Sequence, residues 1–148
     1  VVHDAELLTS LDGLENLGTL DELVIDDNDR LTDLSALSSV SVTGTLSIGD
    51  NQALTSLIGL EGITELAYVD IFDNVALDDL SGLSSLTSVS GDLILDTNPV
   101  LADLDGLGGL EYVGGALIVY DHDNLSDISG LSALETVEGM VSARDSYG

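Results

Sequence analysis

The sequence predicts a repeat solenoid, with a parallel β-sheet on one face and short 3₁₀-helical and extended segments elsewhere. Three observations lead to this fold class. A leucine position recurs every 23 to 24 residues, apolar residues fall at every third position within a repeat, and each repeat ends in an alternating apolar pair. A single repeat cannot bury its own leucines, whereas stacked repeats enclose them in one continuous column.

The recurring leucine defines six repeats, which begin at Leu8, Leu31, Leu54, Leu77, Leu101 and Leu125. We expect them to form one solenoid domain over residues 8–148, preceded by an N-terminal lead-in over residues 1–7. A chain of 148 residues is long enough for one domain of ordinary size and too short for two comfortable ones.

Each repeat combines two patterns. The period-3 ladder suits extended pieces and 3₁₀ turns, because residues i and i+3 share a face in a 3₁₀ turn. The alternating pair has period 2, which predicts a short strand with one buried face. The pairs are Leu23/Ile25, Leu46/Ile48, Val69/Ile71, Leu93/Leu95, Leu117/Val119 and Val141/Ala143. The parallel strands that they predict are centred on Val24, Ser47, Asp70, Ile94, Ile118 and Ser142.

The second repeat slips by one residue relative to this pattern. Val40 is followed by Val42 before Leu46 and Ile48 restore the spacing. A slip inside a strand would turn every later side chain to the other face of the sheet. We therefore expect this slip in a connecting segment, outside the strand.

The charge excludes several classes of function. The chain has 28 Asp and Glu residues against two basic residues, which gives a formal net charge of −26. Binding to nucleic acid or to an anionic membrane surface requires Lys and Arg, so neither is expected. No apolar run approaches the ~18 residues of a membrane-spanning helix, so we expect no membrane insertion. The 44% apolar content excludes a disordered acidic polymer.

No catalytic signature is present. The chain has no cysteine, which excludes disulfides, thiolate zinc sites and a cysteine nucleophile. Arg30 and Arg144, its two cations, lie near opposite ends of the predicted rod, so the acidic residues have no shared cation to stabilise developing charge. We expect that the protein is not an enzyme and that Ca²⁺ is the one cofactor to consider.

The repeat pattern resembles a known family. The sequence L-x-x-L-x-x-L-x-x-L followed by L-x-I-x-x-N is similar to a leucine-rich repeat, from about Leu8 to the end of the chain. Residues 31–37 resemble the internalin type, and residues 89–98 resemble the V-x-G-x-L-x-I-x-x-N strand of receptor L-domains. The resemblance implies a right-handed coil that recognises proteins or carbohydrates, commonly outside the cell. This chain lacks the cysteine-rich caps of many family members.

Asparagine occupies one fixed position after four of the predicted strands. The column contains Asn28, Asn51, Asn74 and Asn98, with His122 at the fifth place and Ser146 at the sixth. A buried Asn can bond both its own turn and the backbone of the next coil, so we interpret the column as a structural ladder. His122 would replace one rung of it. The alternative is a metal ligand or general base beside Asp121 and Asp123.

Two acidic columns follow the same period. One contains Asp27, Asp50, Asp73, Asp121 and Asp145, and the other contains Asp33, Asp79, Asp103 and Asp127. Neighbouring coils place such carboxylates ~5 Å apart, where they repel unless turn amides or ions offset the charge. We favour capping of turns by these side chains. The alternative is Ca²⁺ binding at the densest clusters, which are Asp26, Asp27 and Asp29 and, separately, Asp121 with Asp123.

The scarce aromatic residues gather on one predicted surface. The strand pattern turns Tyr68, Phe72, Ile94, Ile118 and Tyr120 toward solvent on the outer face of the sheet. An apolar and aromatic patch with a polar rim is typical of a partner site, so these five residues are the candidate partner-binding residues. The alternative is ordinary cross-strand packing.

Together these features favour a non-catalytic recognition or adhesion module that binds a protein or glycan through the sheet face. We expect it outside the cell or at the cell surface, although no signal peptide stands at the start of this chain. The strong negative charge also suits a high-salt or marine environment. The alternative function is a structural building block that assembles with further copies of itself, head to tail, through uncapped solenoid ends.

Overall fold

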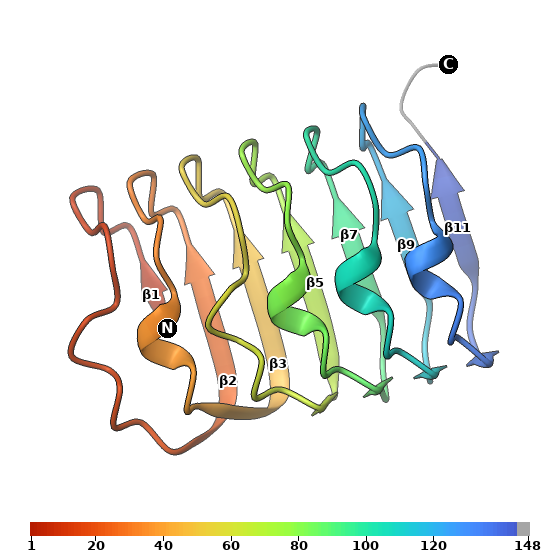
Figure 1. The fold of residues 1–148 in the computed structure, drawn as a ribbon, viewed down its shortest axis with the longest axis horizontal. Coiled ribbons are helices and arrows are strands. Elements are labelled where there is room, and N and C mark those ends of the chain that lie inside the picture. Colours follow the sequence, from red (N-terminus) through yellow and green to blue (C-terminus); the bar gives the residue numbers. More distant parts are fainter. Residues whose placement is uncertain (145–148) are drawn as a thin grey trace.

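The computed structural model describes residues 1–144 and shows a parallel β-solenoid of about six turns. Each turn contributes one strand to a large sheet, and the connecting segments return on the opposite side, where short helices lie (Figure 1). The turns stack along one axis, with β1 at one end of the large sheet and β11 at the other (Figure 1). The predicted fold class is confirmed.

All the strands pair in parallel. In sheet order, the large sheet contains β1 (Val2–His3), β2 (Thr19–Asp26), β3 (Ser41–Gly49), β5 (Tyr68–Phe72), β7 (Leu93–Asp96), β9 (Leu117–Tyr120) and β11 (Val141–Arg144). A small sheet contains β10 (Thr136–Val137), β8 (Tyr112–Val113), β6 (Ser88–Val89) and β4 (Glu65–Leu66). The 3₁₀ helices are η1 (Ser35–Leu37), η2 (Ser81–Leu83), η3 (Asp105–Leu107) and η4 (Ser129–Leu131).

The six predicted strand centres lie opposite one another in the large sheet. Val24 pairs with Ser47, and the same row continues through Asp70, Ile94, Ile118 and Ser142. The side chains on either side of each centre point inward and are buried in β2, β3, β5, β7 and β9. The period of 23 to 24 residues is therefore the length of one turn.

A seventh strand precedes the predicted six. Val2 and His3 form β1, which pairs with β2 through Val2 and Ile25. Subtracting one 23-residue period from Ile25 gives Val2, and the same step places Ala5 where the next turn has Asn28. The first residues thus repeat the end of a turn, and the period alone contains that signal.

The expected position of the slip in the second repeat is wrong. It falls inside β3, where Leu20 pairs with Val42 but Glu22 pairs with Thr45. One extra residue of β3 is therefore accommodated as a β-bulge. Because a bulge leaves one residue unpaired, the strand regains its register and Leu46 and Ile48 still face the core.

The turns that have aspartate at one fixed position contain a 3₁₀ helix. The backbone N–H of Ser35 donates to the Asp33 carboxylate at 2.8 Å, and Asp79, Asp103 and Asp127 accept the equivalent bonds in their turns. The first and third repeats have serine at this position, and no 3₁₀ helix forms there. Their Gly13 and Gly59 instead adopt φ angles of 104° and 112°, which side chains with a Cβ rarely allow.

The core is one column of aliphatic side chains. Successive turns stack the same position on itself, as in Leu31, Leu54, Leu77 and Leu101, all at most 1% exposed. The last described turn lacks a neighbour on one side, because β11 pairs with β9 alone among the described strands. Val141, whose counterpart Leu117 is 3% exposed, is consequently 64% exposed.

The predicted asparagine column forms a hydrogen-bonded ladder beneath the carboxyl ends of the strands. The amide of Asn74 donates to Ile48 O at 3.0 Å in the preceding turn and to Phe72 O at 2.9 Å in its own turn. Its Oδ1 accepts the backbone N–H of Asn51 at 3.2 Å. Equivalent bonds are made by Asn28, Asn51 and Asn98, and all four side chains are fully buried.

His122 takes the fifth rung but completes only part of it. The ring is 2% exposed, and its Nδ1 lies 3.3 Å from the Asn98 N–H and 3.1 Å from Asn98 O. Nε2 is buried and has no hydrogen-bond partner among the described residues. Imidazole therefore replaces the amide at the cost of one unpaired polar atom. The sixth place, Ser146, and Asp145 lie outside the described residues.

We predict that Asn74→Ala lowers the free energy of unfolding by about 3 kcal/mol, because it removes three hydrogen bonds to the backbone of two successive turns. His122→Asn should raise it by about 1 kcal/mol, since an amide can bond on both sides of the rung. Urea unfolding of both variants measures this, with the exposed Asn124→Ala as the matched control. An Asn74→Ala variant as stable as the control would contradict the ladder as a stabilising element.

Candidate functional site

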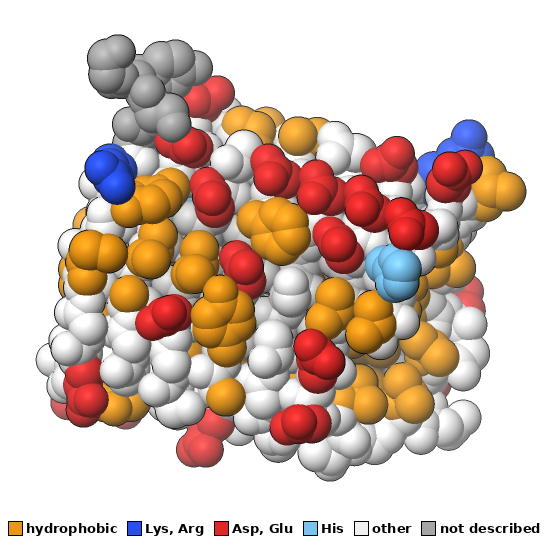
Figure 2. All heavy atoms as spheres, turned by 180° about the vertical axis from the view of Figure 1, so that it is seen from behind, with side chains coloured by type: hydrophobic (Ala, Val, Ile, Leu, Met, Phe, Trp, Pro, Cys, Tyr) orange, Lys and Arg blue, Asp and Glu red, His pale blue; other side chains and the backbone are white. Residues whose placement is uncertain are grey.

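The five predicted partner-binding residues share the outer face of three adjacent strands. Tyr68 and Phe72 lie on β5, Ile94 on β7, and Ile118 and Tyr120 on β9. Ile94 and Ile118 are direct cross-strand neighbours, and all five side chains are half-buried. Figure 2 shows this face, with apolar side chains interspersed among acidic ones. We call this set the face patch.

Two carboxylates interrupt the face patch. Asp70 lies opposite Ile94 in the central row, and Asp96 lies between Phe72 and Tyr120 in the next row. Asp70 also bonds the Tyr68 hydroxyl. Burial, followed by the negative charge of Asp96, raises the pKa of Asp70 above its ordinary value. The strand pattern places both acids on this face, but only the cross-strand register shows that they stand inside the patch.

The Phe72 ring packs against a glycine of the neighbouring strand. Phe72 pairs across the sheet with Gly49, and a Cβ built on Gly49 would come within 2.1 Å of the Phe72 ring. The ring therefore leans over the neighbouring strand and fills the place that any larger residue would occupy. This contact depends on pairing between residues 23 positions apart, so no local pattern reveals it.

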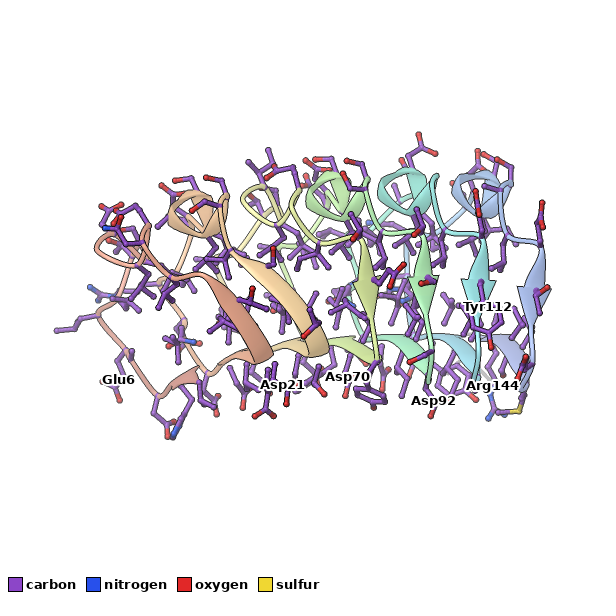
Figure 3. All side chains as sticks on the ribbon, turned by 90° about the horizontal axis from the view of Figure 1, so that it is seen from below. Glu6, Asp21, Asp70, Asp92, Tyr112 and Arg144 are labelled. Carbon is purple, nitrogen blue, oxygen red and sulfur yellow. The ribbon has the colours of Figure 1, made fainter. Side chains whose placement is uncertain are left out.

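Tyr120 already binds a cation from its own chain. The Arg144 guanidinium carbon lies 4.8 Å from the centre of the Tyr120 ring, and Nη2 donates to the Tyr120 hydroxyl at 3.0 Å. Ser142 donates to the same oxygen at 3.2 Å. These two hydrogen bonds lower the pKa of Tyr120. In Figure 3 Asp70, Asp92 and Arg144 lie along the large sheet, away from the short helices.

The first acidic column marks a backbone turn. Asp27, Asp50, Asp73 and Asp121 all have φ between 50° and 55°, and Thr97 and Asp4 share this left-handed conformation. Each follows a strand of the large sheet and precedes the ladder position. Aspartate tolerates this conformation better than most residues with a Cβ, so the column has a structural cause independent of any ligand.

These turns also crowd negative charge along one edge of the face, visible as the acidic upper border in Figure 2. Desolvation raises the pKa of Asp73, and the charges of Asp50 and Asp96 raise it further. Burial likewise raises the pKa of Asp26, with Asp27 and Asp50 adding to the effect. The edge is thus an acidic ridge in which ionised neighbours oppose one another.

The structure does not assemble the predicted calcium ligands into a coordination site. Within residues 1–144, no group of three or more His, Asp or Glu side chains is arranged to hold a metal ion. Asp26 and Asp27 stand at the end of β2, and Asp29 and Asp123 are exposed on turns. Asp121 lies at the left-handed position after β9. Calcium binding stays a prediction.

The side chains of the second acidic column cap turns, which is the role that we favoured from the sequence. Hydrogen bonds from the Ser35 and Ser129 backbones lower the pKa values of Asp33 and Asp127. Both carboxylates face solvent and cap 3₁₀ helices. Because these bonds favour the ionised form, Asp33 and Asp127 stabilise their turns at neutral pH, whereas the raised pKa values of Asp26 and Asp73 mean that their ionised forms oppose folding there.

Comparison with known proteins returned no match: no family model, no curated protein and no solved structure is similar to this chain. The solenoid fold therefore rests on the structure and on the internal repeat. None of the helices within residues 1–144 has the length and apolarity needed to cross a membrane.

We predict that Asp73→Asn raises the melting temperature at neutral pH, because asparagine keeps the left-handed turn and removes one repelled charge. A raised folded pKa means that ionised Asp73 opposes folding above that pKa, and that this penalty disappears as the pH falls through it. The gain should therefore shrink toward acid pH and in ~1 M NaCl, where the Debye length is ~3 Å.

Thermal melts of wild type, Asp73→Asn and the capping control Asp127→Asn measure this effect. The control should show no gain, since its carboxylate is stabilised in the folded state. Equal melting temperatures at every salt concentration would contradict repulsion along the ridge. Wild-type melts in CaCl₂, NaCl of matched ionic strength and EDTA test the calcium prediction: an additional rise with Ca²⁺ supports it, and equal melts contradict it.

Proposed function

We propose that the chain is a leucine-rich-repeat solenoid of the receptor L-domain or internalin type, acting as a non-catalytic recognition module. Its partner is a protein or a carbohydrate bound through the sheet face, outside the cell or at the cell surface. The proposal follows from the L-x-x-L ladder and the L-x-I-x-x-N strand, both of which now have defined structural roles in a parallel solenoid.

The observation that supports the sheet face as the binding surface is the face patch itself. Three of the chain's five aromatic residues project from the same side of the large sheet, on β5 and β9, which flank β7. The inner side chains of the sheet, such as Val69 and Leu95, are fully buried in the core, which holds the strands rigidly in place. A rigid surface with clustered aromatic rings loses little conformational entropy on binding.

Replacing Phe72 and Tyr120 together by Ser should weaken binding at least tenfold while the fold is retained, because such residues contribute much of an interface's energy. The matched control is Ile58→Ser with Val75→Ser, whose side chains are 51% and 43% exposed and lie outside the face patch. Circular dichroism and thermal melts of both variants check that they are folded.

The ligands for this test come from a displayed peptide library and a glycan array, each screened against the wild-type chain. Affinities of the selected ligands are then measured for both variants. Loss of binding on the Phe72/Tyr120 variant alone supports the proposal. Equal affinity for this variant and the control would show that the face patch is not the binding surface.

A second function, assembly with further copies, is favoured by the exposed end of the solenoid. Ile128, Met140 and Val141 are 56%, 57% and 64% exposed near β11, which pairs with β9 alone among the described strands. An open strand edge with apolar side chains is a template for another chain. Arg144 on this last strand, however, interacts with Tyr120 of its own chain and is not free to contact the acidic first turn of another copy.

If the end mediates assembly, the solution mass of the wild type should rise with concentration, and Ile128→Ser with Val141→Ser should reduce it to that of a monomer. Sedimentation across a concentration series measures this, with Ile58→Ser as the control for lost surface hydrophobicity. A wild-type mass that stays monomeric throughout would exclude the building-block function.

A further inference from the structure

We propose that the sheet face binds an extended protein segment through its arginine or lysine side chains, one of which stacks on Phe72 beside Asp96. This inference rests on the proposed function, because it specifies the chemistry of the partner at the same surface. It excludes a neutral glycan as the principal ligand.

The chain's own Arg144 shows how the face holds a cation. Tyr120, Asp96 and Phe72 follow one another along a single row of the large sheet, with Arg144 at its end. At that end the guanidinium lies over the Tyr120 ring, 4.8 Å from its centre. Such cation–π contacts are favourable even at exposed sites and stronger when partly desolvated.

The other side of Asp96 also has an aromatic ring, that of Phe72, although without the hydroxyl that Tyr120 offers to Arg144. Phe72 lies directly across from Asp96, ~4.8 Å away at the spacing of neighbouring strands. Its ring leans over Gly49 and remains half-buried, which leaves part of it open to a partner. Asp50 comes directly after β3, next to Gly49, and Asp73 comes directly after β5, next to Phe72. A guanidinium placed on Phe72 would therefore meet an aromatic ring and carboxylates together.

The electrostatics of this region favour a cation. Burial is the main cause of the raised pKa values of Asp70 and Asp73, and the charge of Asp96 raises both further, so these carboxylates oppose one another. A bound cation relieves that repulsion as well as forming new contacts. The chain cannot supply the cation itself, since it has no lysine and its other arginine, Arg30, lies in the turn after β2.

Asp70 extends the cation-binding site to the central row of the sheet. It stands between Tyr68, whose hydroxyl it bonds, and Ile94 on β7. Side chains two residues apart in an extended peptide lie ~7 Å apart on one side. One such segment laid over β5 and β7 can thus present one cation near Asp96 and a second near Asp70.

The test uses a short labelled peptide with arginine at every second position, and the same peptide with the neutral isostere citrulline. Binding to the wild-type chain is measured by fluorescence anisotropy at ~0.15 M salt, where charges beyond ~8 Å are screened. We expect the citrulline peptide to bind at least tenfold more weakly than the arginine peptide. Equal affinities would overturn the proposal.

Matched variants separate this site from general attraction to an acidic protein. Asp70→Asn with Asp96→Asn removes two charges from the face and keeps oxygens for the bonds from Tyr68 and Thr97. Glu111→Gln with Glu135→Gln removes two exposed charges next to the small sheet. We expect the first variant to bind the arginine peptide about tenfold more weakly and the second to lose less than about twofold. Equal losses would overturn the proposal.

Phe72→Leu tests the ring without changing charge, and should weaken binding several-fold. An unchanged affinity would overturn the stacking arrangement. The variants are expected to fold, because Asp70→Asn and Asp96→Asn remove mutual repulsion; thermal melts verify this. If the screened ligands depend on Phe72 and Tyr120 but contain no cation, the face remains a binding surface and only the cationic partner is excluded. If the binding of the screened ligands does not depend on Phe72 and Tyr120, both proposals fail.

Discussion

The hydrogen bonds of the asparagine ladder are the interaction on which the rest of the structure depends. Each turn of the solenoid must leave its strand, reverse direction and begin the next period-3 segment. At that point backbone groups are buried with no strand to pair them, and such groups are costly when unsatisfied. An Asn side chain, with two donors and an acceptor, bonds its own turn and both neighbouring turns, as Asn74 does with Phe72, Ile48 and Asn98.

The ladder also determines where charge accumulates. The residue before each ladder position adopts a left-handed conformation, as Asp50 and Asp73 do. Aspartate tolerates that conformation, and the repeat places aspartate at this position in several turns of the stack. The acidic ridge is therefore a consequence of turn geometry repeated at the spacing of one strand. Its raised pKa values reflect the repulsion that this repetition produces.

Stacking has a second consequence, for recognition. A parallel solenoid aligns equivalent residues of successive turns into rows, so a few substitutions along one row create a composite surface. The row Phe72, Asp96, Tyr120 and Arg144 combines rings, a carboxylate and a cation that are 24 residues apart from one to the next. None of these residues contributes to the core, so the surface can vary in chemistry while the ladder and the leucine column keep the fold.

The sequence by itself determined the fold class, the length of a turn and the inward or outward direction of the strand residues. It could do so because burial repeats with the same period as the chain, as at Leu31, Leu54 and Leu77. The asparagine column and the Asp33-type caps were also predictable, since each acts within its own turn or at one fixed period. The same period reaches β1, because Val2 lies one period before Ile25, but the six predicted repeats begin only at Leu8.

The tertiary structure alone decided what depends on cross-strand register and on missing neighbours. The bulge in β3, the seating of Phe72 on Gly49 and the stacking of Arg144 on Tyr120 each require knowing which residue lies opposite which. The 64% exposure of Val141 follows from the lack of a described turn beyond it, which its own sequence pattern does not reveal. The periodic pattern predicts which side chains are buried inside the stack. Cross-strand register and position along the stack decide which side chains lie together on its surface.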